Sequence, residues 1–105
     1  MRLGAAAMII LIVAAPFSYA LAVDDAEALA LVQKHCVMCH AAKPTHESFQ
    51  EAPKNIALET IADIKKHAAT ISAQTVQTKA MPLGNQTGMT DEERATLDQW
   101  LKNQQ

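Results

Sequence analysis

Apolar positions recur at helical spacing in three stretches of the chain, separated by segments rich in proline and polar residues. The first stretch follows Asp24 and Asp25, whose carboxylates suit a helix start because they accept from free N–H groups and face the positive end of the dipole. One face then carries side chains at steps of three and four: Leu29, Val32, Cys36 and Cys39. The pattern predicts a helix that runs into the cysteine-containing segment, with His35 off this face and in solvent.

The second stretch covers residues 58–78 and predicts a helix, either continuous or divided into two short helices that meet near His67. Its apolar face consists of Ile61, Ile64, Ala68, Ile71 and Val76. Between the first two stretches, residues 41–55 contain Pro44 and Pro53 among polar side chains. This composition predicts a loop, because proline interrupts regular structure.

The third stretch predicts a capped helix near the C-terminus. Thr90 and Glu93 have the spacing of a capping box, so we expect the helix to run from Asp91 to about Asn103. Its apolar face comprises Leu97, Trp100 and Leu101, and its water-facing side Glu92, Arg94, Asp98 and Lys102. The three stretches together predict an all-α domain.

Residues 1–22 have the layout of a secretory signal peptide: one positive charge at Arg2, an apolar run, and small residues at Ala20 and Ala22. We expect cleavage after Ala22, which leaves residues 23–105 as the mature domain in the periplasm. A retained anchor at the outer face of the inner membrane is the alternative. The stretch after Arg2 carries no charge and is about long enough to span a bilayer.

Charge and size narrow the possible partners. The formal net charge is −2 for the whole chain and −3 once Arg2 leaves with the leader, and no basic patch indicates a nucleic-acid partner. Outside the leader, Phe49 and Trp100 are the only aromatic residues. A domain this small, with so little apolar bulk, commonly needs a metal, a disulfide or a cofactor to be stable.

The segment Cys36-Val37-Met38-Cys39-His40 has the spacing that attaches a c-type haem. Two intervening residues on a short helical turn bring both sulfurs to one edge of the rigid ring, where they would form thioethers with its vinyl groups. His40 would ligate the iron from one side. Export agrees with this prediction, because haem is attached covalently outside the cytoplasmic membrane.

Three other interpretations use the same cysteines, Cys36 and Cys39. A thioredoxin-like redox motif calls for a surrounding βαβ pattern, and a four-ligand zinc site calls for a second Cys or Cys/His pair; the sequence offers neither. A disulfide between the two would close too short a loop to add much stability. If Cys36 and Cys39 formed a disulfide or a zinc half-site, the protein would be an interaction module without haem.

Met81 is the predicted ligand on the other side of the iron. It precedes Pro82, which places it on an irregular loop, and a soft thioether suits reduced iron and raises the reduction potential relative to a second histidine. Met89 is the competing thioether, but it directly precedes the capping box, where we expect it to pack against its own helix. His46 and His67 are further alternatives.

In the order helix, CxxCH, loop, helix, Met-Pro and capped helix, the mature chain resembles a small class I cytochrome c. The resemblance implies three to four helices around one covalently attached haem, with the first and last helices crossing. It implies that Cys36 and Cys39 hold the haem. It also implies that His40 and Met81 are the axial iron ligands, and that the protein carries single electrons and is no enzyme.

A more specific likeness, to the cytochrome c tail of bacterial membrane-bound urate hydroxylases, covers residues 52–60, 71–76 and 80–90. Those proteins fuse such a tail to a multi-span membrane domain. The likeness therefore implies a detached electron acceptor for a urate hydroxylase-like or other membrane dehydrogenase, which passes electrons on toward a terminal oxidase. The alternative function is a haem enzyme or gas sensor, which needs an open sixth position on the iron.

Overall fold

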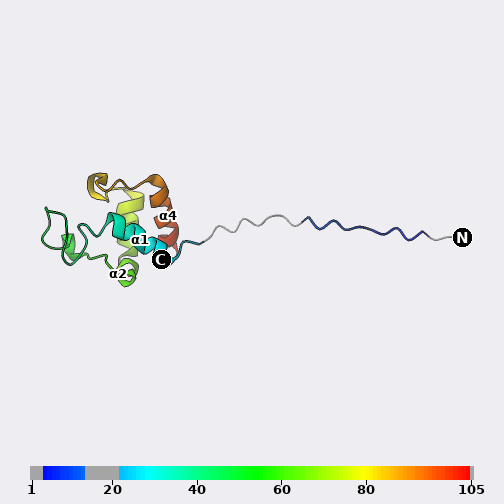
Figure 1. The fold of residues 1–105 in the computed structure, drawn as a ribbon, viewed down its shortest axis with the longest axis horizontal. Coiled ribbons are helices and arrows are strands. Elements are labelled where there is room, and N and C mark those ends of the chain that lie inside the picture. The colour runs from blue at the N-terminus through cyan, green and yellow to red at the C-terminus, as the bar shows by residue number, and fades with distance from the viewer. Residues whose placement is uncertain (1–3, 14–21, 105) are drawn as a thin grey trace.

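The computed structural model describes residues 4–13 and 22–104, and all its helices lie in the second range (Figure 1). Four are α-helices, η1 and η3 are single 3₁₀ turns, and η2 is a turn of π-helix. In chain order they are α1 (Asp25–His35), η1 (Pro53–Asn55), α2 (Ile61–Lys66), α3 (Ala68–Ile71), η2 (Ser72–Gln77), η3 (Leu83–Asn85) and α4 (Asp91–Lys102). The described residues contain no strand, so the predicted all-α class is confirmed.

Half of the leader predicted over residues 1–22 lies outside the described residues, which omit 1–3 and 14–21. Residues 4–13 carry neither helix nor strand, and their apolar side chains are exposed. Within the part of the chain that the structure describes, no helix has the length and apolar character to cross a membrane. Cleavage after Ala22 and the retained anchor both stay predictions.

α1 and α4 pack directly against each other and form the centre of the core (Figure 1). Val32 on α1 and Leu97 and Trp100 on α4 are almost completely buried, as their spacing predicts. Each such side chain contributes about 1.5–3 kcal/mol on burial. The Trp100 Nε1–H also donates to Asp25 Oδ1 over 3.0 Å, and this bond, together with Lys65, holds the pKa of Asp25 below its usual value.

The second predicted stretch is broken at His67, as in the divided form of the prediction. α2 begins at Ile61, later than predicted, because Thr60 and Asp63 form a capping box in which each side chain accepts from the other's backbone N–H. His67 leaves the helical conformation with φ −104° and ψ 16°, and α3 and η2 continue beyond it. Ile64, Ala68 and Ile71 are the buried apolar residues of α2 and α3, and Ser72 and Thr75 are buried on η2.

Two polar residues are buried against expectation. His35 and Arg94 are predicted to face solvent, yet they are only 3% and 8% exposed. Both predictions are wrong because distant segments supply hydrogen-bond partners: two side chains for the imidazole, and backbone carbonyls and an amide for the guanidinium. A helical-face pattern contains no information about such partners.

Candidate haem-binding site

A cavity of about 280 Å³ lies between the end of α1, the loop that follows it, the α3–η2 segment and the Met81 loop, which we define as residues 79–89. Its walls are mostly apolar, as in most small-molecule sites. All four site residues predicted from the sequence lie on these walls: Cys36, Cys39, His40 and Met81. The fold therefore brings the CxxCH segment and the distant methionine to one cavity.

The CxxCH segment is a tight turn that continues from α1. The Cys36 N–H donates to the Val32 carbonyl over 2.8 Å and closes the helix. The N–H groups of Cys39 and His40 then both donate to the Cys36 carbonyl, over 3.2 and 2.8 Å. This local hydrogen bonding directs both thiols and the imidazole to the same cavity.

Both cysteines are free thiols and half-buried. Burial raises the pKa of the Cys36 thiol to about 11, with a further contribution from Cys39, and burial also raises the pKa of Cys39. A thioredoxin-like motif needs the opposite shift, because the thiolate is the reactive form. Among the described residues, no three side chains of His, Cys, Asp or Glu are placed so that they could hold a metal ion together.

His40 is held so that one ring nitrogen is available. Its Nδ1 lies 2.8 Å from the Ile56 carbonyl oxygen, which accepts only, so Nδ1 carries the hydrogen and donates. In the neutral ring Nε2 then keeps its lone pair, as a histidine bound to a metal requires. The His40 backbone is held as well, since its carbonyl accepts from the Leu58 N–H over 2.8 Å.

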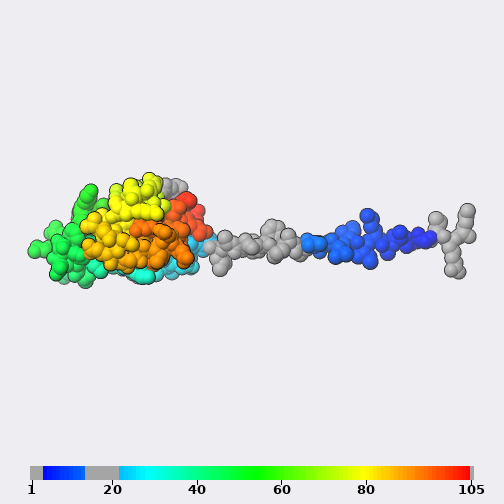
Figure 2. All heavy atoms as spheres, turned by 90° about the horizontal axis from the view of Figure 1, so that it is seen from above, coloured from blue at the N-terminus to red at the C-terminus, as the bar shows by residue number. Residues whose placement is uncertain are grey.

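The two candidate methionines have different surroundings. Met81 is half-buried on the cavity wall, and its N–H donates to the Gln74 carbonyl over 2.9 Å. Met89 is 4% exposed in the hydrophobic core and does not line the cavity. Of the two thioethers, only that of Met81 has access to the cavity. Figure 2 shows the Met81 loop, coloured yellow to orange, beside α4 at the surface of the domain.

His46 and His67, the two alternative ligands, also line the cavity, and their surroundings differ. His46 has both ring nitrogens engaged: Nδ1 accepts from the Ser48 N–H over 3.1 Å, so Nε2 carries the hydrogen and donates to Gln86 Oε1 over 3.1 Å. Ligation by His46 would break one of these bonds. His67 sits where α2 gives way to α3 and stays the alternative to Met81.

His35 is a cavity residue that the sequence pattern missed. Its Nε2–H donates to Glu93 Oε2 over 2.9 Å, and Nδ1 lies 2.7 Å from Thr87 Oγ1. These contacts join the end of α1 to the start of α4. The bond from His35, followed by that from the Thr90 backbone, lowers the pKa of Glu93 to about 2. The Glu93 carboxylate thus caps α4 and pairs with α1 at once.

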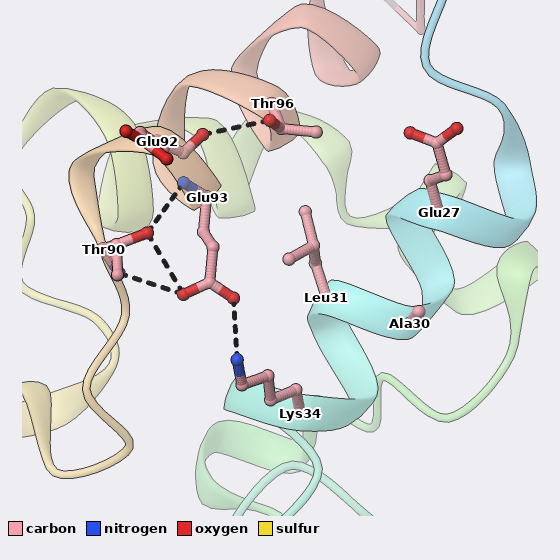
Figure 3. A pocket seen from close by; sticks show the side chains of 8 residues that line it. All are labelled: Glu27, Ala30, Leu31, Lys34, Thr90, Glu92, Glu93 and Thr96. Atoms are coloured by element: carbon pink, nitrogen blue, oxygen red, sulfur yellow. Dashed lines mark hydrogen bonds and ion pairs between the residues drawn. The ribbon is translucent and has the colours of Figure 1, made fainter.

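A second hollow, of about 480 Å³, lies on the outer side of the α1–α4 contact (Figure 3). Its floor includes Ala30 and Leu31, and its rim carries charged side chains, among them Lys34, which pairs with Glu93 Oε2 over 3.2 Å. It is wide open to solvent and is lined by no cysteine, histidine or methionine. The hollow therefore offers none of the chemistry of the CxxCH cavity.

Comparison of the chain with models of protein families, with curated proteins and with solved structures gives no match in any of the three. The cavity offers an apolar lining, two thiols on one turn, an imidazole with an available Nε2 and a thioether. This donor set fits a covalently attached haem, with Cys36 and Cys39 as attachment points and His40 and Met81 as iron ligands.

Proposed function

We propose that this chain is an exported single-electron carrier, a cytochrome c-like protein that holds one haem c. The observation that carries the proposal is the meeting of Cys36, Cys39, His40 and Met81 on one apolar cavity, with the His40 Nε2 free to bind a metal. When bound, the haem supplies a one-electron couple between ferrous and ferric iron.

The residues of the chain have distinct roles in this proposal. Cys36 and Cys39 would hold the haem through thioether bonds, each formed by addition of S–H across one vinyl group, so that no oxidant would be consumed. The Ile56 carbonyl keeps the His40 ring in one orientation and one tautomer. The thioether of Met81 and the apolar lining both favour the reduced state and raise the reduction potential.

A carrier of this kind exchanges electrons with larger proteins through small, short-lived interfaces. The resemblance to urate hydroxylase tails suggests a urate hydroxylase-like or other membrane dehydrogenase as the donor. The electron acceptor would be a protein on the terminal-oxidase side of the electron-transfer pathway. Both partners are in the periplasm or face it from the inner membrane, and no nucleic acid is involved.

The covalent bond is tested by expressing the full-length chain in a host that matures c-type haem. We expect the secreted product to keep peroxidase staining on a denaturing gel and to have the mass of the polypeptide plus one haem. A variant with Cys36→Ala and Cys39→Ala should lose the stain. A colourless product with the mass of the bare peptide would overturn the proposal.

The sixth ligand is tested with a matched pair of methionine variants. Leucine replaces methionine at nearly constant volume. We therefore expect the sulfur-to-iron charge-transfer band of the ferric holoprotein to disappear in Met81→Leu and to persist in Met89→Leu. A high-spin wild-type spectrum without this band would favour the haem enzyme or gas sensor, because the sixth position would then be open.

A further inference from the structure

Arg94 is a buried cation on the first turns of α4, and its acceptors are two backbone carbonyls and one side-chain amide. Its Nη1 donates to the Thr75 carbonyl over 2.6 Å and to the Met81 carbonyl over 2.7 Å. Its Nη2 donates to Asn85 Oδ1 over 3.4 Å. None of the ion pairs found among the described residues includes Arg94.

These contacts fix the backbone of Met81 from both sides. The Met81 N–H donates to the Gln74 carbonyl on η2, while the Met81 carbonyl accepts from Arg94 on α4. Because one nitrogen of Arg94 serves both Thr75 and Met81, it also holds η2 and the Met81 loop together. The methionine thereby depends on α4, thirteen positions further along the chain.

The charge of Arg94 makes this arrangement sensitive to substitution. A hydrogen bond to a charged group contributes about 1.5–3 kcal/mol to stability. A buried carbonyl that loses its donor has no compensation for its removal from water, so the loss of Arg94 would destabilise the fold further. Lysine is a poor replacement, because a single ammonium on a flexible stem does not reproduce the planar fork of donors. Few other side chains reach three acceptors in two segments, η2 and the Met81 loop.

We propose that Arg94 is the positioning residue that keeps the Met81 thioether directed at the cavity, and so controls how readily a small external ligand reaches the iron. The inference rests on the proposed function, because it concerns the same site. It goes further by naming a residue outside the cavity lining as the determinant of access to the sixth position.

The first experiment measures cyanide binding to the ferric holoprotein. An external ligand competes with Met81, so its apparent affinity rises with the fraction of molecules in which the Met81 loop is open. We expect Arg94→Gln and Arg94→Lys each to raise the cyanide association constant about tenfold or more.

The matched control is Lys102→Gln. It removes the same charge from the same helix, but Lys102 is 72% exposed and pairs only with Asp98 one turn away. Its cyanide association constant should equal that of the wild type. Equal constants in Arg94→Gln and Lys102→Gln would overturn the inference.

A second readout does not depend on the iron. Trypsin cleaves after lysine, and exposed Lys79 lies two residues before Met81 in the Met81 loop. Cleavage of the Lys79–Ala80 bond in the holoprotein should be faster in the two Arg94 variants than in Lys102→Gln, with unchanged helical circular dichroism. Unchanged cleavage rates would contradict the proposed role of Arg94.

If neither Arg94 variant yields holoprotein, amide hydrogen exchange of the wild type tests whether Arg94 links the Met81 loop to α4. The Met81 amide should exchange together with the interior amides of α4, since Arg94 links the two. Exchange about 100-fold faster at Met81 would show that the loop opens independently of α4 and would overturn the inference.

The experiments also separate this inference from the proposed function. A wild-type holoprotein without the sulfur-to-iron band refutes Met81 ligation, and the role of Arg94 falls with it. A wild type that has the band, with Arg94 variants indistinguishable from Lys102→Gln, refutes the role of Arg94 alone.

Discussion

The two sides of the cavity are held in place by different means. On the His40 side, the turn of Cys36–His40 is closed by hydrogen bonds within five residues, and Ile56 and Leu58 complete it. On the Met81 side, the loop depends on Arg94 from α4 and on Gln74 from η2. The turn that carries His40 is closed by hydrogen bonds of its own and is then fixed by Ile56 and Leu58, whereas both backbone hydrogen bonds of Met81 go to other elements, η2 and α4.

The difference suggests which of the two proposed ligands is the more easily displaced. A turn closed by its own hydrogen bonds keeps its backbone when packing loosens, whereas a loop held only by other elements opens when those contacts are lost. His35 and Glu93 link the two sides, because the first precedes Cys36 and the second precedes Arg94.

Replacement of the local ligand should be the most damaging change. In His40→Ala we expect no low-spin holoprotein, because the iron loses the ligand that the turn provides. His46→Ala is the matched control, since both nitrogens of His46 are engaged in hydrogen bonds, and it should keep the wild-type absorption spectrum. A low-spin His40→Ala protein with the wild-type charge-transfer band would contradict the assignment.

The link between the two sides should respond to pH. The pKa of Glu93 is lowered from 4.5 to about 2, so the folded state favours the carboxylate, and its contribution is complete above pH 4.5 and is lost as pH falls toward 2. We expect Glu93→Gln to lower the free energy of unfolding at pH 7 by about 1–2 kcal/mol, less than the full linkage value because the carboxylate keeps some contact with water.

The measurement is urea unfolding of Glu93→Gln and of the neighbouring control Glu92→Gln between pH 2 and pH 7. The wild type and the control should lose stability in parallel below pH 4.5. The Glu93→Gln curve should be flatter in that range. A Glu93→Gln variant that loses stability with acid as steeply as the control would show that this carboxylate is not responsible.

The smallest effect is expected in the Met81 loop itself. The Asn85 side chain accepts from the Met89 N–H over 2.9 Å and donates to the Met89 carbonyl over 3.3 Å. Asn85→Ala should therefore lower the free energy of unfolding by about 1 kcal/mol. Gln86→Ala, at the exposed next position, should stay within about 0.5 kcal/mol of the wild type. Equal effects of the two substitutions would mean that Asn85 does not stabilise the loop.

The helices were predictable because their signals are local. In α1 the cap at Asp24 lies within a few turns of the apolar residue Val32. In α4 the cap at Thr90 lies similarly close to Leu97 and Trp100. The structure confirms both caps and the burial of these apolar residues. The capping box at Thr90 also predicted that Met89, just before it, packs against its own helix. In the structure Met89 lies in the core and Met81 lines the cavity.

The burial of His35 and Arg94 was not predictable in this way. Each residue occupies a position that is polar by pattern, and each is buried by partners 9 to 58 positions away in the chain. The capping glutamate was the one available signal for His35: a carboxylate at the start of one helix attracts a histidine at the end of another. No comparable signal exists for Arg94, since two of its acceptors are main-chain oxygens.

The use of main-chain oxygens has a consequence for how such a protein can vary. The imidazole of His40 is oriented by the carbonyl of Ile56, and the guanidinium of Arg94 meets the carbonyls of Thr75 and Met81. Every amino acid brings that carbonyl, so the acceptor itself does not depend on the residue type at positions 56 and 75. A search for shared residue types would pass over these supports, even between proteins that place these side chains in the same manner.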